Sequence, residues 1–202
     1  MTPRPIFKDT RQALRFAYMI EHLPAREGGS LGRQLERMQI EETGIIPARD
    51  ESSISFAGLS DQEIRGQCSL IRASVEHHLP GPENWSVRSK WGATEIERGP
   101  DRAIIRACFT RDRIEAMTRM AEYAEASLAQ SRTTCLWLIA RVCAESDEVR
   151  PTLRQIEEAS GCPKSTAERA EKRIKRMLST FTNLAVDRLT PLFLRDGLVP
   201  QD

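Results

Sequence analysis

The chain has 202 residues, of which 40% are hydrophobic, 29% are charged and only 5% are aromatic. This length accommodates one large domain or two small ones, and an aliphatic, highly charged composition is typical of helices rather than sheets. The formal net charge of +1 leaves no global attraction to nucleic acid, so any basic surface must be local. Because no apolar run reaches the length of a membrane span and the N-terminus lacks the apolar stretch of a signal peptide, we expect a soluble, cytoplasmic protein without a membrane partner.

The five cysteines are an odd number without close pairs, which argues against a disulfide framework. Four of them fall among aliphatic residues at helical spacing, so we expect small buried hydrophobes in a reducing compartment. A zinc site formed by Cys68, His77 and His78 is the alternative, but no Cys-x-x-Cys pair supports it. The sequence therefore predicts no metal and no cofactor.

Helix signals recur along the N-terminal part of the chain, and strand signals do not. The first helix is predicted at about residues 10–23, before Pro24, and the second at about residues 30–42. Residues 45–58 are interpreted as a loop or linker, in which Ile54–Phe56 forms at most a short extended piece.

Residues Ser60 to Glu63 have the form of a capping box, in which the two end residues satisfy each other's backbone N–H groups. The helix that follows is expected to bury one stripe and to end at Leu79; the stripe contains Ile64, Cys68, Ile71 and Val75. A short helix with Trp85 and Trp91 is predicted next, ended by Gly92.

Gly99, Pro100 and Asp101 are expected to open another long helical region. Its apolar stripe alternates steps of three and four residues: Ile114, Met117, Ala121, Ala124 and Leu128. Such a stripe is interpreted as core, and a coiled-coil or homodimer seam is the alternative.

The C-terminal third begins with a short, strongly apolar helix that carries Cys135, Leu136, Ile139, Val142 and Cys143. A charged loop from Glu145 to Arg150 leads to Pro151, and two further helices are predicted around a tight turn at Gly161. Together these elements predict a tri-helical module.

The segment from Ile156 to Ile174 resembles the helix-turn-helix of bacterial and phage regulators and of the promoter-reading region of sigma factors. Ile156 and Ala159 are expected to face inward from the first helix, and Gly161 supplies the left-handed turn. The small or apolar residues that follow match the buried side of the second helix: Cys162, Ala167, Ala170 and Ile174. One departure is Glu157, which stands where the family has alanine, at an edge where its carboxylate can reach solvent.

The second helix of the motif is the expected recognition helix, and it begins either near Pro163 or at Ser165, where Ser165 and Glu168 form a second potential capping box. In this motif the N-terminal part of that helix enters the major groove. Arg169 is the first choice for a bidentate contact to guanine, and Glu168 for accepting from a cytosine amine.

The predicted DNA-binding residues lie on the exposed side of this helix and at the start of the preceding one. Phosphate contacts are assigned to the basic side chains of the second helix. Thr152 and Arg154, at the start of the preceding helix, are expected to contact the DNA backbone. The full set is Lys164, Ser165, Thr166, Glu168, Arg169, Lys172, Arg173, Arg176, Thr152 and Arg154. The alternative is a structural helical hairpin, since the pairs Glu168 with Lys172 and Glu171 with Lys175 also suit any solvated helix.

The apolar stripe continues beyond a minimal motif until Pro191, through Ile174, Leu178, Phe181, Ala185 and Leu189. We expect this extension to pack within the chain, with a second subunit or another partner as alternatives. The tail from Leu192 to Asp202 is expected to dock back or to bind a partner.

A more diffuse resemblance covers more of the chain. A helix followed by Leu79–Pro82, a short helix ending in Trp91 and Gly92, and a C-terminal sigma-like module are similar to phage late-gene antitermination proteins. That resemblance implies DNA binding near a promoter and contact with RNA polymerase. Some members carry a cysteine zinc finger, which this sequence lacks.

Enzyme motifs such as a P-loop, a dinucleotide fingerprint or a nucleophile elbow are absent from the sequence, so we expect no enzyme. The predicted fold class is all-α, with a helical domain at residues 1–130 and a helix-turn-helix domain with an extended last helix at residues 131–202. The predicted function is transcription regulation by sequence-specific binding to double-stranded DNA. The alternatives are a DNA-binding structural or packaging adaptor and a simple promoter-occluding repressor.

Overall fold

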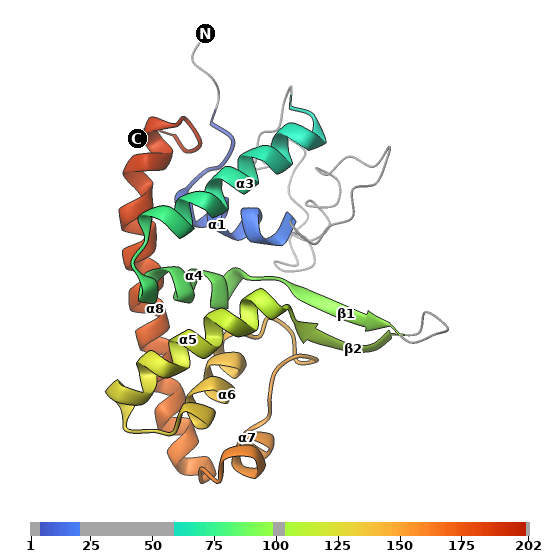
Figure 1. Cartoon of the computed structure of the whole chain (residues 1–202), viewed down its shortest axis with the longest axis vertical. Helices are drawn as coiled ribbons and strands as arrows, with labels where there is room; N and C mark the ends of the chain where they lie inside the picture. Colours follow the sequence, from blue (N-terminus) through green and yellow to red (C-terminus); the bar gives the residue numbers. More distant parts are fainter. Residues whose placement is uncertain (1–4, 21–58, 99–103, 201–202) are drawn as a thin grey trace. The chain divides into compact units, whose positions relative to one another are not determined.

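A computed structural model describes residues 5–20, 59–98 and 104–200 of the chain. This part is mostly helical and contains a single two-stranded sheet, which confirms the all-α fold class (Figure 1). The elements are α1 (Thr10–Met19), α3 (Asp61–His78), α4 (Gly81–Trp91), β1 (Thr94–Arg98), β2 (Ile104–Phe109), α5 (Arg111–Leu128), α6 (Arg132–Cys143), α7 (Leu153–Ser160) and α8 (Lys164–Arg195). The predicted helix at residues 30–42 and the extended piece at Ile54–Phe56 lie outside the described residues.

The chain forms two compact units, one made of residues 1–74 and 188–202 and the other of residues 75–187. Helices α3 and α8 therefore each contribute residues to both units. This division differs from the expected boundary between residues 130 and 131. Helices α5 and α6, which lie on the two sides of that boundary, cover each other's apolar faces within the second unit.

In the first unit, α1 begins at Thr10 because Asp9 caps it: the Asp9 carboxylate accepts from the Gln12 backbone N–H at 2.7 Å. The other end of α1 receives two arginines of α3. Arg72 donates to the Ala17 carbonyl at 2.6 Å, and Arg65 donates to the Ile20 carbonyl at 3.2 Å. These cations satisfy carbonyls that a helix C-terminus leaves without partners, and they complement its dipole.

The C-terminal tail docks back onto its own unit. Leu198 and Val199 are buried, and the Phe7 backbone N–H donates to the Leu198 carbonyl at 3.0 Å. Helix α8 continues through Pro191, the expected end of its stripe, as far as Arg195. The exposed Pro191 removes one helical N–H, while Phe193, two residues later, is fully buried.

The predicted start of α3 is confirmed. The Ser60 backbone N–H donates to the Glu63 carboxylate at 2.7 Å, and the Glu63 N–H donates to the Ser60 hydroxyl at 3.3 Å. All four residues of the predicted stripe are buried: Ile64, Cys68, Ile71 and Val75. Helix α4 ends at Trp91, immediately before Gly92, as expected.

The hairpin β1–β2 corrects the expectation of a long helical region after Gly99. Its antiparallel register pairs Thr94 with Phe109 and Glu97 with Arg106, with an irregularity after Glu97. The sequence from Thr94 to Phe109 is rich in isoleucine and contains a Gly-Pro-Asp turn signal, a combination that favours a hairpin. The following helix, α5, begins only at Arg111, where the Thr110 hydroxyl caps it.

The stripe of α5 is confirmed as core except at its first position. Met117, Ala121, Ala124 and Leu128 are buried within the single chain, whereas Ile114 is 46% exposed. The inward position of the first turn is occupied by Arg113, which is fully buried. The buried face therefore begins one residue earlier than the apolar pattern indicates.

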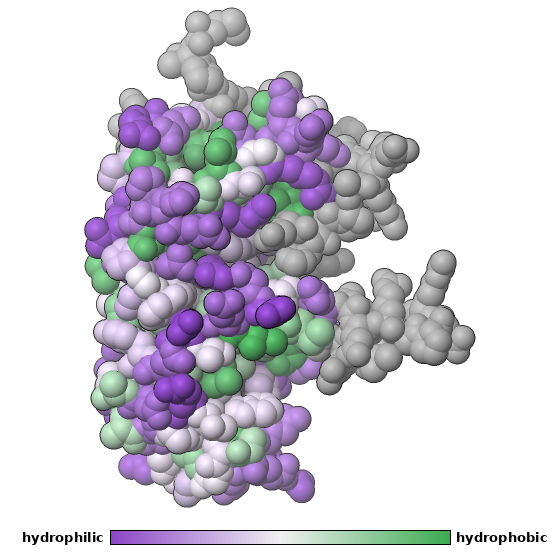
Figure 2. Space-filling model, in the orientation of Figure 1, coloured by the Kyte–Doolittle hydropathy of each residue, from purple (hydrophilic) through white to green (hydrophobic). Residues whose placement is uncertain are grey.

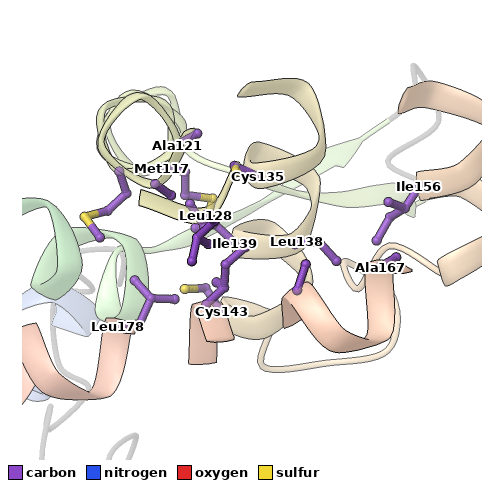
Figure 3. Packing of buried hydrophobic residues seen from close by; sticks show 14 of the residues in the cluster. Met117, Ala121, Leu128, Cys135, Leu138, Ile139, Cys143, Ile156, Ala167 and Leu178 are labelled. Carbon is purple, nitrogen blue, oxygen red and sulfur yellow. The ribbon is translucent and has the colours of Figure 1, made fainter. Parts of the chain in front are cut away.

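The core of the second unit joins α5, α6, α7 and the first part of α8. In Figure 3, Ile156 and Ala167 lie beside Leu138 at one end of this cluster, and Met117 and Ala121 of α5 lie toward the other. Hydrophilic residues cover most of the face seen in Figure 2, with hydrophobic residues between them in small groups. None of the helices in the described ranges has the length and apolar character that a membrane crossing requires.

Candidate nucleic-acid interface

Helix α7 begins at a complete capping box. The Thr152 hydroxyl accepts from the Gln155 N–H at 3.2 Å, and the Gln155 side chain accepts from the Thr152 N–H at 2.7 Å. Ile156 is fully buried, as expected, but Ala159 is exposed and does not face inward. The inward face of α7 instead contains Leu153, Ile156 and Ser160. On a helix, the residues three and four positions after Ile156 lie near the same face, and here it is the fourth, Ser160, that faces inward.

The turn between α7 and α8 has the predicted glycine conformation. Gly161 has a φ of 67° and a ψ of 8°, and its N–H donates to the Glu157 carbonyl at 2.8 Å. A Cβ at this position would meet no atom within 4 Å. Glycine is therefore favoured here by the left-handed backbone conformation and not by lack of space for a side chain. Cys162 is buried directly after the turn, and Glu157 is exposed, as expected.

Helix α8 begins at Lys164, between the two expected starts. The Pro163 carbonyl accepts from the N–H groups of Thr166 and Ala167, both at 2.9 Å, so Pro163 lies just outside the helix and Ser165 lies inside its first turn. The inward stripe is buried along its length: Ala167, Ala170, Ile174 and Leu178. By helical periodicity the directly opposite stripe contains Ser165, Arg169, Lys172 and Arg176, all exposed.

The exposed side of this helical segment is basic. Residues 164–176 contain six basic and two acidic residues, a local net charge of +4 in a chain whose total is +1. One of the two acids, Glu171, forms an ion pair with Arg141 at 3.2 Å and does not project into solvent as a free charge. The local field therefore favours an anionic partner.

The predicted contact residues of α8 differ in their surroundings. Lys164, Glu168, Lys172 and Arg176 are exposed, whereas Thr166 is half-buried. The Arg169 guanidinium folds along its own helix and donates to the Ser165 carbonyl at 3.2 Å. Arg173 lies beside the exposed stripe of α8, and its guanidinium donates to the Ser127 carbonyl of α5 at 3.4 Å.

The two predicted residues at the start of α7 are exposed and already engaged. Thr152 uses its hydroxyl in the helix cap. Arg154 forms an ion pair with Glu158 at 2.8 Å, one turn along the same helix. A phosphate contact by Arg154 would replace this exposed pair, whose own contribution to stability is about 0.3–0.5 kcal/mol.

Sequence reasoning missed Arg141, which connects α6 with α8 and with the segment that leads into α7. Its side chain leaves α6, pairs with Glu171 of α8 and donates to the Pro151 carbonyl at 2.7 Å, immediately before α7. No local pattern identifies this role, because its partners lie 10 and 30 residues away.

Three cysteines of the second unit, Cys135, Cys143 and Cys162, are buried thiols, whereas Cys108 is partly exposed. Burial raises the pKa of Cys135 to about 11 and that of Cys143 to about 12, so both stay protonated near neutral pH. The alternative zinc ligands are not assembled: Cys68 is buried in α3, while His77 and His78 are exposed at its end. Within the described ranges no group of three or more metal-ligating side chains lies together.

Comparison of the chain with models of known protein families and with curated proteins finds no match.

Proposed function

We propose that this protein binds double-stranded DNA in a sequence-specific manner and regulates transcription. In the proposed complex the N-terminal part of α8 enters the major groove, and the start of α7 contacts the sugar-phosphate backbone. The observation that carries the proposal is that α8 has a buried apolar stripe on one side and an exposed basic stripe on the opposite side. The buried stripe joins the helix to the core, and the stripe on the opposite side presents Arg169, Lys172 and Arg176 to solvent.

The turn at Gly161 supports this proposal independently of charge. A left-handed glycine followed by Cys162 and Pro163 directs α8 away from α7 after a three-residue connection, which is the length that a helix-turn-helix uses. The short connection leaves the first turn of α8 exposed at the end of the module. A helical hairpin with a purely structural role has no need for the exposed basic residues along this part of α8.

The roles of the exposed residues follow from their positions. Arg169 lies near the N-terminal end of α8, where major-groove contacts are made, and its planar guanidinium matches the acceptor pair of guanine. Arg176 lies further along the same stripe, where the helix leaves the groove and phosphate contacts are expected. Glu168, one residue before Arg169, is positioned to accept from a cytosine amine.

The test begins with selection of bound DNA from a random pool, with and without RNA polymerase. Binding of the selected site and of random DNA is then measured for two variants. Arg169→Ala is expected to weaken binding to the selected site by about 1–3 kcal/mol, or roughly 5- to 150-fold in Kd, and to relax preference at one base pair. Its effect on random DNA is expected to be small.

Arg176→Ala is the matched comparison, because it removes the same side chain from the same stripe. As a phosphate contact it is expected to weaken binding to both DNAs by similar factors. The slope of the logarithm of the binding constant against the logarithm of the salt concentration is expected to become shallower by about one. Equal losses on both DNAs for Arg169→Ala would make Arg169 a phosphate contact. Absence of any selected sequence would contradict sequence-specific binding.

A further inference from the structure

Arg141 is a partly buried arginine whose partners lie in α8 and in the segment that leads into α7. Its Nε lies 3.2 Å from Oε2 of Glu171 in α8, and its Nη1 donates to the Pro151 carbonyl at 2.7 Å. The side chains of Arg141 and Glu171 are 24% and 29% exposed, so solvent screens this ion pair less than it screens the surface pairs. A planar guanidinium can hold both partners at once because its donors form a rigid fork.

The two partners of Arg141 belong to the two elements whose separation matters for reading DNA. Pro151 is buried and immediately precedes Thr152, the cap of α7, so fixing its carbonyl fixes where α7 begins. Glu171 lies in α8 between Arg169 and Lys172, so its carboxylate restrains the segment that carries the exposed basic stripe. One side chain thus ties the expected phosphate-contacting end of α7 to the expected base-reading part of α8.

We propose that Arg141 is a positioning residue that sets the register between α7 and α8 and thereby determines sequence discrimination. This inference rests on the proposed DNA-binding function. Phosphate contacts orient a protein on the duplex, and base contacts succeed only when the reading side chains then meet the correct base edges. Loosening the connection between the two elements therefore reduces binding to the selected site more than it reduces binding to random DNA.

The main variant is Arg141→Met, which keeps a long side chain and removes both polar connections. The expected result is a rise of about tenfold in the Kd for the selected site and a change below about twofold for random DNA. Arg141→Lys is the conservative variant. One ammonium reaches either Glu171 or the Pro151 carbonyl, so it is expected to retain stability and to recover only part of the discrimination.

Arg88→Met is the matched control. Arg88 also joins two helices of the same unit through a carboxylate, Asp112 of α5, but touches neither α7 nor α8 through that contact. This variant is expected to bind both DNAs as the unmodified protein does. Any general loss of stability caused by removing an interhelical ion pair would appear in both arginine variants.

Hydrogen exchange of the DNA-free protein supplies a readout that does not depend on DNA binding. In Arg141→Met, amides of α7 are expected to exchange about tenfold faster, while the exchange rates of α5 amides stay unchanged. In the Arg88→Met control, the exchange rates of α7 amides are expected to stay unchanged. Unchanged α7 exchange together with unchanged discrimination would overturn the positioning role. Equal losses on the selected and random DNAs would also overturn it.

The same experiment separates this inference from the proposed function. If Arg169→Ala alters sequence preference but Arg141→Met does not, DNA reading stands and the positioning role is wrong. If the unmodified protein shows no sequence preference, the proposed function is wrong, and the role of Arg141 in discrimination is wrong with it. The exchange measurement then still reports whether Arg141 restrains α7 mechanically.

Discussion

Arg113 is the fully buried charged residue around which the start of α5 is organised. Its guanidinium donates to the carbonyls of Ser89, Lys90 and Cys143 at 2.9, 3.1 and 2.7 Å, and lies over the Phe109 ring. Burial lowers the pKa of Arg113, and the nearby Glu145 carboxylate opposes that shift. The side chain thus connects α4, the end of β2 and the end of α6, and its hydrogen bonds to the Ser89 and Cys143 carbonyls are buried.

Arg113→Met is expected to destabilise the protein by about 3–5 kcal/mol, because buried carbonyl groups lose their donor. Arg119→Met on the same helix is the control, since Arg119 is exposed and pairs with Glu122 one turn along α5; its expected effect is below about 0.5 kcal/mol. Denaturant unfolding of both variants gives the comparison. Similar free energies of unfolding would show that the buried network around Arg113 contributes no more than a surface pair.

At the scale of single elements, the helix termini connect sequence to structure most directly. Ser60 and Glu63 begin α3, Thr152 and Gln155 begin α7, and Gly161 ends α7. Each of these signals acts over at most four residues, so neighbouring elements do not alter it. Two of them also provide tests that are specific to one helix end.

The capping box of α3 predicts a pH dependence. Hydrogen bonds from the Ser60 side chain and backbone lower the pKa of Glu63. A carboxylate whose folded pKa is depressed contributes stability above its unfolded pKa, and that contribution disappears as the pH falls through the folded pKa. The melting temperature of Glu63→Ala is therefore expected to lie below that of the unmodified protein at neutral pH, and the difference is expected to shrink well below the ordinary glutamate pKa of about 4.3. A pH-independent difference would exclude the ionised capping box as its cause.

The turn at Gly161 predicts a separation between stability and DNA binding. Gly161 and Gly197 have nearly equal φ angles of 67° and 69°, and both have open space where a Cβ would stand. Valine is expected to cost at least about 1–2 kcal/mol at either position, since a β-branched residue resists left-handed backbone. Only Gly161→Val is expected to weaken binding to the selected DNA site, because Gly197 lies at the far end of α8. Equal affinity in the two variants would show that the turn does not orient α8 for DNA.

At the scale of the whole molecule, the proposed DNA-reading module shares its core with α5, on the other side of residue 130. Buried residues of α6, including Leu138 and Ile139, share one core with Met117 and Met120 of α5. Each fully buried side chain of this size contributes about 1.5–3 kcal/mol, against a typical net stability of 5–15 kcal/mol. Loss of α5 therefore removes a large part of the margin that keeps α6, α7 and α8 folded together.

A fragment of residues 131–202 is accordingly expected to be unfolded or only partly helical and to lack sequence-specific DNA binding. Circular dichroism and thermal melting of the fragment, compared with the full chain, provide the measurement. A cooperative melting transition with retained preference for the selected site would show instead that the expected boundary at residue 130 separates independent domains.

The sequence by itself determined the helical class, the capped start of α3, the buried stripes and the glycine turn before α8. Caps, turns and periodicity depend on residues within one or two helical turns, so their physical causes are contained in the local sequence. The same holds for the exposed basic stripe of α8, because burial of Ala167, Ala170 and Ile174 on one side leaves Arg169 and Lys172 on the other.

Only the tertiary structure decided which positions of those patterns become core and how the elements are joined. Arg113 is buried and Ile114 exposed because carbonyls some 23–30 residues away surround the arginine. Likewise, Arg141 meets its ion-pair partner Glu171 only because α6 and α8, 30 residues apart at this contact, pack together. Contacts at such separations depend on how helices pack, which the local free energies of helix formation do not specify.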